Sequence, residues 1–226
     1  MNKIIAAAVG VVFFSGVLFS SAKAAEKGST YIRLQPTHVI FDAIGFSQSL
    51  SGYGVTVTAA GEWAFDAGYG ISGAFGRKLS KNVSIETEIG YSSVDYNAVN
   101  ITATFTSGGS TFTSVGQADV KGQIKMLTTL VNLIFSAPGP NFSPYVGGGI
   151  GFANFWDEIN SIGTLTVNGE ESGFTILANG ILGFDYKMAD DMALGLQYRY
   201  VWAASGHDGV DDATAHVIAL SAKINF

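Results

Sequence analysis

The chain has 226 residues, no cysteine and a formal net charge of −6. Charged residues make up 13% and apolar residues 47%, which excludes intrinsic disorder, because disorder needs high charge and low hydrophobicity. Without cysteine there is no disulfide framework, no cysteine zinc site and no thiol catalysis. The negative charge argues against a nucleic-acid partner, since phosphate binding needs a basic surface.

The first 24 residues have the pattern of a secretory signal. Lys3 precedes the apolar run 4–19, and Ala22-Lys23-Ala24 supplies the small residues of a cleavage site. The run is shorter than the ~20 residues that a membrane-spanning helix needs, and no longer apolar run follows it. We therefore expect 1–24 to be a signal peptide and 25–226 to form one exported domain that is not a helical inner-membrane protein.

Apolar and polar residues alternate along the exported domain with a period of two, which is typical of β-strands. In the last segment Leu220, Ile224 and Phe226 share one face, and Ser221 and Lys223 share the other. The same alternation predicts eight strands, at about 29–41, 63–75, 83–91, 125–135, 145–156, 174–187, 193–202 and 218–226.

The predicted strands are joined by three short and four long connections. The short ones are 79–82, 138–141 and 189–191, and the long ones are 42–62, 93–119, 157–172 and 203–212. Within the second long connection, the Ser/Thr/Gly-rich segment 101–115 is expected to be a mobile loop. Pro36 lacks a backbone donor, so we expect a bulge or the end of regular pairing there.

The two faces of the predicted strands differ in a way that indicates a membrane protein. One face carries charges and glycines, and the other is aliphatic and aromatic on every strand. A soluble barrel directs its bulky residues inward, and an apolar outer face would aggregate in water. Strands of about 10 residues, tilted by ~40°, span about 25 Å, the height of the lipid-facing band of outer-membrane barrels. We therefore predict that the apolar face contacts lipid and that the sheet closes on itself, because hydrocarbon offers no partner to a free edge.

These observations predict an all-β fold, an eight-stranded antiparallel up-and-down transmembrane β-barrel. An even number of strands puts both termini in the periplasm, the four long loops outside the cell and the three short turns in the periplasm. So narrow a barrel is filled by its own side chains, and buried charges must pair. We expect an ionic network that plugs the lumen, formed by Arg33, Asp66, Glu86, Glu88, Asp185, Arg199 and Lys223. The alternative is a narrow ion path.

Other candidate sites have structural explanations. The glycines of segment 68–73 match G-x-G-x-x-G, but they alternate within a strand, whereas a dinucleotide fold needs a helix to begin there. The three histidines, His38, His207 and His216, lack the spacing of a helical zinc site, and no His-x-Ser pair occurs. We predict no catalytic residue, no metal site and no cofactor, and we place His216 at the lipid-side rim.

The long connections are acidic, and two lysines lie near them. Asp208, Asp211 and Asp212 are candidates for a divalent cation, although a solvated acidic loop is the preferred interpretation. Lys121 and Lys125 fall on the apolar face near the outer end of their strand. There they would contact the phosphates of lipopolysaccharide or extend into the headgroup layer.

Three segments resemble a known family: 68–76 (GYGISGAFG), 143–151 (SPYVGGGIG) and 222–226 (AKINF). With them, residues 28–226 resemble the small eight-stranded outer-membrane barrels of the opacity and OmpA-like surface-antigen group. The resemblance implies a monomeric Gram-negative envelope protein without catalysis, whose loops act as an adhesin or antigen toward a host or surface ligand. Phe226 and Ile224 are similar to the terminal signal that the barrel-assembly machinery reads. The rival functions are a porin-like channel and an enzyme that modifies lipid A.

Overall fold

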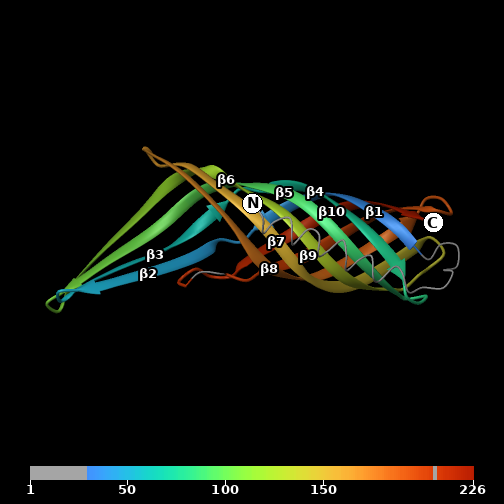
Figure 1. Ribbon diagram of the computed structural model, residues 1–226, viewed down its shortest axis with the longest axis horizontal. Coiled ribbons are helices and arrows are strands. Elements are labelled where there is room, and N and C mark those ends of the chain that lie inside the picture. Colours follow the sequence, from blue (N-terminus) through green and yellow to red (C-terminus); the bar gives the residue numbers. More distant parts are fainter. Residues whose placement is uncertain (1–29, 206–207) are drawn as a thin grey trace, which may run out of the picture.

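The computed structural model describes residues 30–205 and 208–226, and within them the chain is built from strands (Figure 1). The predicted signal peptide, 1–24, lies outside the described residues. The strands are β1 (Thr30–Phe41), β2 (Ile44–Gly52), β3 (Val55–Phe65), β4 (Gly68–Lys78), β5 (Val83–Ser107), β6 (Ser110–Ser136), β7 (Phe142–Ile162), β8 (Leu165–Lys187), β9 (Met192–Ala203) and β10 (Ala213–Asn225). No helix in this part of the chain is long and apolar enough to cross a membrane.

Eight of the strands close a barrel. Their order around the wall is β5-β4-β1-β10-β9-β8-β7-β6, and β6 pairs back with β5. Neighbours are antiparallel throughout, and the first and last strands are joined from Tyr31↔Asn225 to Phe41↔Ala215. Closure gives the backbone groups of the wall their hydrogen-bond partners within the chain, as a hydrocarbon environment requires. The predicted eight-stranded antiparallel barrel is confirmed.

Side chains alternate across the wall, with the apolar ones outside. On β9, Leu194, Leu196 and Tyr198 are 40–43% exposed, whereas Gln197 and Arg199 between them are 2% and 7% exposed. This is the inverse of a soluble protein and is the arrangement of a lipid-facing wall around a polar interior.

The short turns and the C-terminal residue share one end of the barrel, here called the short-turn end (Figure 1). The turns are 79–82, 137–141 and 188–191. Ser136 N donates to Asn82 O at 2.7 Å, and Lys187 N donates to Asn141 O at 2.8 Å, so adjacent turns are tied together. Lys187 Nζ also donates to Asp190 Oδ1 at 2.8 Å, and this bond lowers the pKa of that carboxyl.

At the opposite end, the long-hairpin end, three of the four predicted loops are strands instead. β2 and β3 occupy most of 42–62, and β7 and β8 extend to Ile162 and Leu165. Segment 101–115, predicted to be a mobile loop, is β-structure turned at Gly108 and Gly109, whose φ values of 56° and 84° suit glycine. Threonine alternating with apolar residues favours strands, and this preference extends the hairpins beyond the wall. Only 203–212 remains a connection without a strand among the described residues.

Two predictions about individual strands were also wrong. The predicted strand 63–75 is divided, because β3 ends at Phe65 and the chain turns through Asp66 before β4 begins at Gly68. Pro36 causes neither a bulge nor a strand end, since the β1–β4 register is constant from Thr30↔Arg77 to Val39↔Gly68. Pairing of β1 with β10 skips only two residues at Pro36 and resumes in the same register. The backbone pairs on either side of Pro36 keep the strands aligned, so the absence of one N–H donor does not shift the register.

Candidate functional site: the lumen and the projecting sheet

The lumen near the short-turn end holds a cluster of paired charges centred on Arg33. The guanidinium nitrogens Nη1 and Nη2 of Arg33 lie 2.8 and 3.1 Å from the two carboxylate oxygens of Asp185, and Nε lies 3.4 Å from Glu86 Oε1. Lys223 Nζ donates to Asp185 at 3.2 Å, and Tyr31 OH donates to Glu86 at 2.7 Å. Two cations therefore meet two carboxylates, and this balance offsets the cost of burying each charge.

A second ionic layer crosses the middle of the lumen. Arg199 on β9 and Glu88 on β5 form a bidentate pair in which both N–O distances are 2.8 Å. Asn132 Nδ2 on β6 donates to Glu88 Oε2 at 3.2 Å, and Gln35 Nε2 on β1 donates to Gln197 Oε1 on β9. Because β9 and β5 lie on opposite sides of the barrel, the Arg199–Glu88 pair spans the bore, and the other two contacts join strands closer together around the wall.

The part of the lumen toward the long hairpins contains apolar clusters, together with a hydrogen bond of 2.9 Å from Tyr96 OH to Asp157 Oδ2. Leu130, Ala153 and Leu177 are each at most 5% exposed and pack together. Further out, Val39 and Val94 belong to a second apolar cluster. The sequence predicted the enclosed charges but not this apolar packing. Val, Ala and Leu at inward positions of the strands, toward the long-hairpin end, are the signal that indicates it.

Asp66 lies outside the ionic layers, whereas the six other residues proposed for the network lie within them. Asp66 is exposed at the corner between β3 and β4 and accepts a hydrogen bond of 2.6 Å from Asn97 Nδ2. The prediction failed because it continued the alternation of β4 backward through a residue where the chain turns. Uncharged partners that the sequence analysis did not single out complete the layers: Tyr31, Gln35, Ser72, Asn132, Tyr145, Asn179, Gln197 and Ser221.

The two lysines proposed to meet lipopolysaccharide have different surroundings. Lys125 Nζ lies 3.0 Å from Glu158 Oε1 on β7, and Gln123 Nε2 donates to the same carboxylate at 3.2 Å. Lys121, four residues earlier on β6, is exposed. The charge of Lys125 is therefore matched within the protein, which leaves Lys121 as the better placed of the two for an external phosphate.

The histidines do not form part of a metal-holding group in the described residues. His216 Nδ1 lies 2.7 Å from Tyr198 OH, and its Nε2 lies 3.6 Å from Asp42 Oδ1, on the outer surface. The ring of His38 lies 5.1 Å from that of Tyr69 and is tilted by 49° to it, and His207 lies outside the described residues. Within those residues no group of three or more His, Asp or Glu side chains is arranged to hold a metal ion.

In the acidic connection 203–212, one carboxylate accepts hydrogen bonds from neighbouring residues of the same chain. Asp212 accepts hydrogen bonds from Trp202 Nε1 at 3.1 Å and from Ser205 N at 2.7 Å. At the other end of β10, Phe226 N donates to Thr30 O at 2.9 Å, and Phe226 is 55% exposed.

Beyond the wall, β2, β3 and the outer parts of β5 and β6 form a four-stranded sheet, here called the projecting sheet (Figure 1). Cross-strand pairing places four apolar side chains side by side on one face, the apolar row: Leu50, Val57, Phe105 and Phe112. Leu50 is 81% and Phe112 67% exposed. The same face continues into Trp63 and Val99, which pack in the cluster at the mouth of the lumen.

The other face of the projecting sheet, the hydroxyl face, consists of paired serines and threonines. One row is Ser49, Thr58, Thr104 and Thr113, and the next is Ser51, Thr56, Thr106 and Thr111. Hydroxyl oxygens of Ser49 and Thr58 lie 3.0 Å apart, and those of Ser51 and Thr56 lie 2.9 Å apart. The signal for this sheet was present in the sequence as S-x-S and T-x-T repeats.

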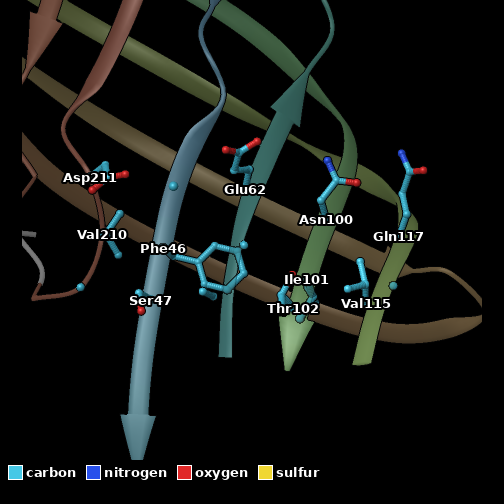
Figure 2. A pocket seen from close by; sticks show the side chains of 15 residues that line it. Phe46, Ser47, Glu62, Asn100, Ile101, Thr102, Val115, Gln117, Val210 and Asp211 are labelled. Carbon is cyan, nitrogen blue, oxygen red and sulfur yellow. The ribbon is translucent and has the colours of Figure 1, made fainter. Parts of the chain in front are cut away.

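A groove of about 810 Å³ lies where the projecting sheet meets the wall (Figure 2). Glu62, Asn100 and Gln117 occupy directly paired positions on β3, β5 and β6. Gly45 holds the corresponding position on β2, and the side chain of Asp211 fills the space that a Cβ there would need. Two carboxylates and two carboxamides thus line one row of the groove.

Comparison with known proteins agrees with this architecture. A family model, the outer membrane protein beta-barrel domain, matches residues 9–226. The chain belongs to this family. It is therefore an integral protein of the outer membrane of a Gram-negative bacterium.

Solved structures share the barrel at low sequence identity. The outer membrane protease OmpT of Escherichia coli is 7% identical, with 91% of this chain and 99% of that one covered and a TM-score of 0.51. Neisserial surface protein A is 12% identical over 89% and 100%, with a TM-score of 0.49, and OprG of Pseudomonas aeruginosa is 16% identical over 88% and 97%, with 0.47. The likeness to OmpT concerns the fold alone. Comparison with curated proteins gave no match.

Proposed function

We propose that the protein is a closed, non-enzymatic barrel that supports the envelope and displays the projecting sheet at the cell surface. The filled lumen is the observation that supports this proposal. Two ionic layers span the bore, and apolar side chains pack the part beyond them. Porins, which leave an open aqueous channel, have about 16–18 strands, whereas eight strands enclose a space that side chains can fill.

Conductance in a planar lipid bilayer tests the closed lumen. The purified protein is expected to give no steady current steps above the background of the detergent. Regular steps of fixed size would show a narrow channel and refute the plug. Mass spectrometry of lipid A from cells with and without the protein tests the absence of catalysis, and a modification that depends on the protein would refute it.

The proposed orientation places the long-hairpin end outside the cell and the short-turn end in the periplasm. Outer-membrane barrels have short periplasmic turns and longer extracellular loops, and this barrel has its three short turns at one end. The projecting sheet would then meet surface or host ligands. An epitope tag inserted between Gly108 and Gly109 should bind antibody on intact cells, and a tag read only after lysis would reverse the orientation.

Three partners follow from the same arrangement. Lipid would contact the outward apolar residues, and the exposed Lys121 would contact a lipopolysaccharide phosphate. Phe226 and Ile224, outward on the last strand, would form the signal for the barrel-assembly machinery. The chain would act as a monomer, because its own strands close the ring. Phe226→Ala is expected to lower the amount of assembled barrel in the outer membrane without changing synthesis.

A further inference from the structure

The projecting sheet is almost free of charge. Segments 43–61 and 100–118 contain no Asp, Glu, Lys, Arg or His, and they supply most of its four strands. Acidic residues begin immediately beyond these limits, at Glu62 and Asp119. Along the strand, the apolar row lies about five residues from Glu62, roughly 17 Å, which exceeds the Debye length of ~8 Å at physiological salt. Asp208 comes closer at the edge of the sheet, because its backbone oxygen accepts a hydrogen bond of 2.8 Å from Gln48 Nε2, two residues before Leu50.

The far end of the sheet exposes apolar side chains that nothing in the described chain covers. Besides the apolar row, Tyr53 at the β2–β3 turn is fully exposed, and Val55 beside it is 39% exposed. The row crosses all four strands in direct register, so its side chains form one continuous strip. Exposed strips of this kind mark contact with a protein or a membrane.

We propose that the apolar row docks on a neutral lipid surface, the zwitterionic headgroup layer of a second membrane or vesicle facing the cell. Aromatic and aliphatic side chains enter the boundary between headgroups and acyl chains, where Phe and Tyr partition well. The lack of charge in both segments removes the cost of desolvating ions. Serine and threonine on the hydroxyl face remain able to bond to water and headgroups.

The inference rests on the proposed orientation, which points the sheet away from the protein's own membrane. The projecting sheet, which carries the strip, lies at the end of the barrel opposite to the short turns (Figure 1). Contact with an anionic surface would call for lysine or arginine near the strip, and none occurs in either segment. The chemistry therefore favours a neutral surface.

Flotation tests the proposal. The full-length protein, reconstituted in nanodiscs, is mixed with phosphatidylcholine vesicles and floated through a density gradient, with empty nanodiscs as background. Protein-bearing nanodiscs should float with the vesicles. The variant Leu50→Ser/Phe105→Ser/Phe112→Ser should lose at least about tenfold in binding, since burying one such side chain is itself worth roughly that factor. Binding should change by less than about twofold between low and high salt, because no ion pair contributes.

A matched variant on the hydroxyl face, Thr58→Ser/Thr104→Ser/Thr113→Ser, should bind like the wild type. Heat-modifiable migration on a denaturing gel shows whether each variant is a folded barrel. The proposal is overturned if the wild type does not float, if the apolar-row variant floats equally, or if binding needs anionic lipid and disappears in salt. Association only between protein-bearing nanodiscs would show that a second copy covers the strip. Nanodiscs expose both ends of the barrel, so a negative flotation result would refute lipid docking without bearing on the proposed orientation. The epitope tag tests the orientation separately.

Discussion

Replacing Arg199 by methionine should destabilise the barrel strongly. The substitution removes two hydrogen bonds of 2.8 Å and leaves the Glu88 carboxylate, 2% exposed, with only uncharged donors, Asn132 Nδ2 at 3.2 Å and the Ser72 hydroxyl. Removing one partner of a buried ion pair typically costs 3–5 kcal/mol, so we expect the free energy of unfolding to fall by about 4 kcal/mol. Each 1.4 kcal/mol is a factor of about ten, so the unfolding equilibrium should shift by roughly three orders of magnitude.

Urea unfolding in lipid vesicles, followed by tryptophan fluorescence, measures this loss. In the double variant Glu88→Met/Arg199→Met no charge is left unpaired, and most of the stability should return. Lys125→Met is the matched control, because its ion pair with Glu158 is 31% and 37% exposed and should contribute less than about 1 kcal/mol. A loss below about 1 kcal/mol for Arg199→Met, or a double variant as unstable as the single one, would refute the account of a buried pair that sustains the plug.

Other substitutions test the lumen in the same assay. Gly76→Ala puts a methyl group into the ring of Tyr31 and should cost about 1–3 kcal/mol, whereas Gly73→Ala meets nothing within 4 Å and should be nearly neutral; equal effects would contradict the close packing. Asp185→Asn leaves two buried cations underpaired and should cost about 3–5 kcal/mol. Asp66→Asn should stay within about 0.5 kcal/mol, and a larger loss would return Asp66 to the network.

The wall of the barrel was readable from the sequence because lipid and lumen demand opposite residues at alternate positions. Strand β9 shows this contrast directly, with apolar Leu194, Leu196 and Tyr198 outward and polar Gln197 and Arg199 inward. The pattern is local, so it predicts which side chains point inward. It does not predict which of them meet, since contacts across the bore depend on the register of all eight strands.

The long hairpins escaped prediction for a compositional reason. Segment 101–115 is rich in Ser, Thr and Gly, and this composition is shared by loops and by solvated strands. Asp66 was misplaced because a turn of two residues ends one alternation and starts another. The register that forms the apolar row follows from pairing β2 with β3 and β5 with β6, and no single segment contains that information.

The outward surface of the strands changes from apolar on the wall to serine and threonine on the hydroxyl face of the projecting sheet. This change sets the depth at which the protein sits in its bilayer. Sinking by a few ångströms would immerse rows of alcohol groups in acyl chains, and rising by as much would bring the leucines and tyrosines of the outer wall into water. Both displacements are opposed by free energy that grows with the area transferred. The boundary between apolar and hydroxyl-bearing residues along the strands therefore fixes the insertion depth of the barrel along the membrane normal.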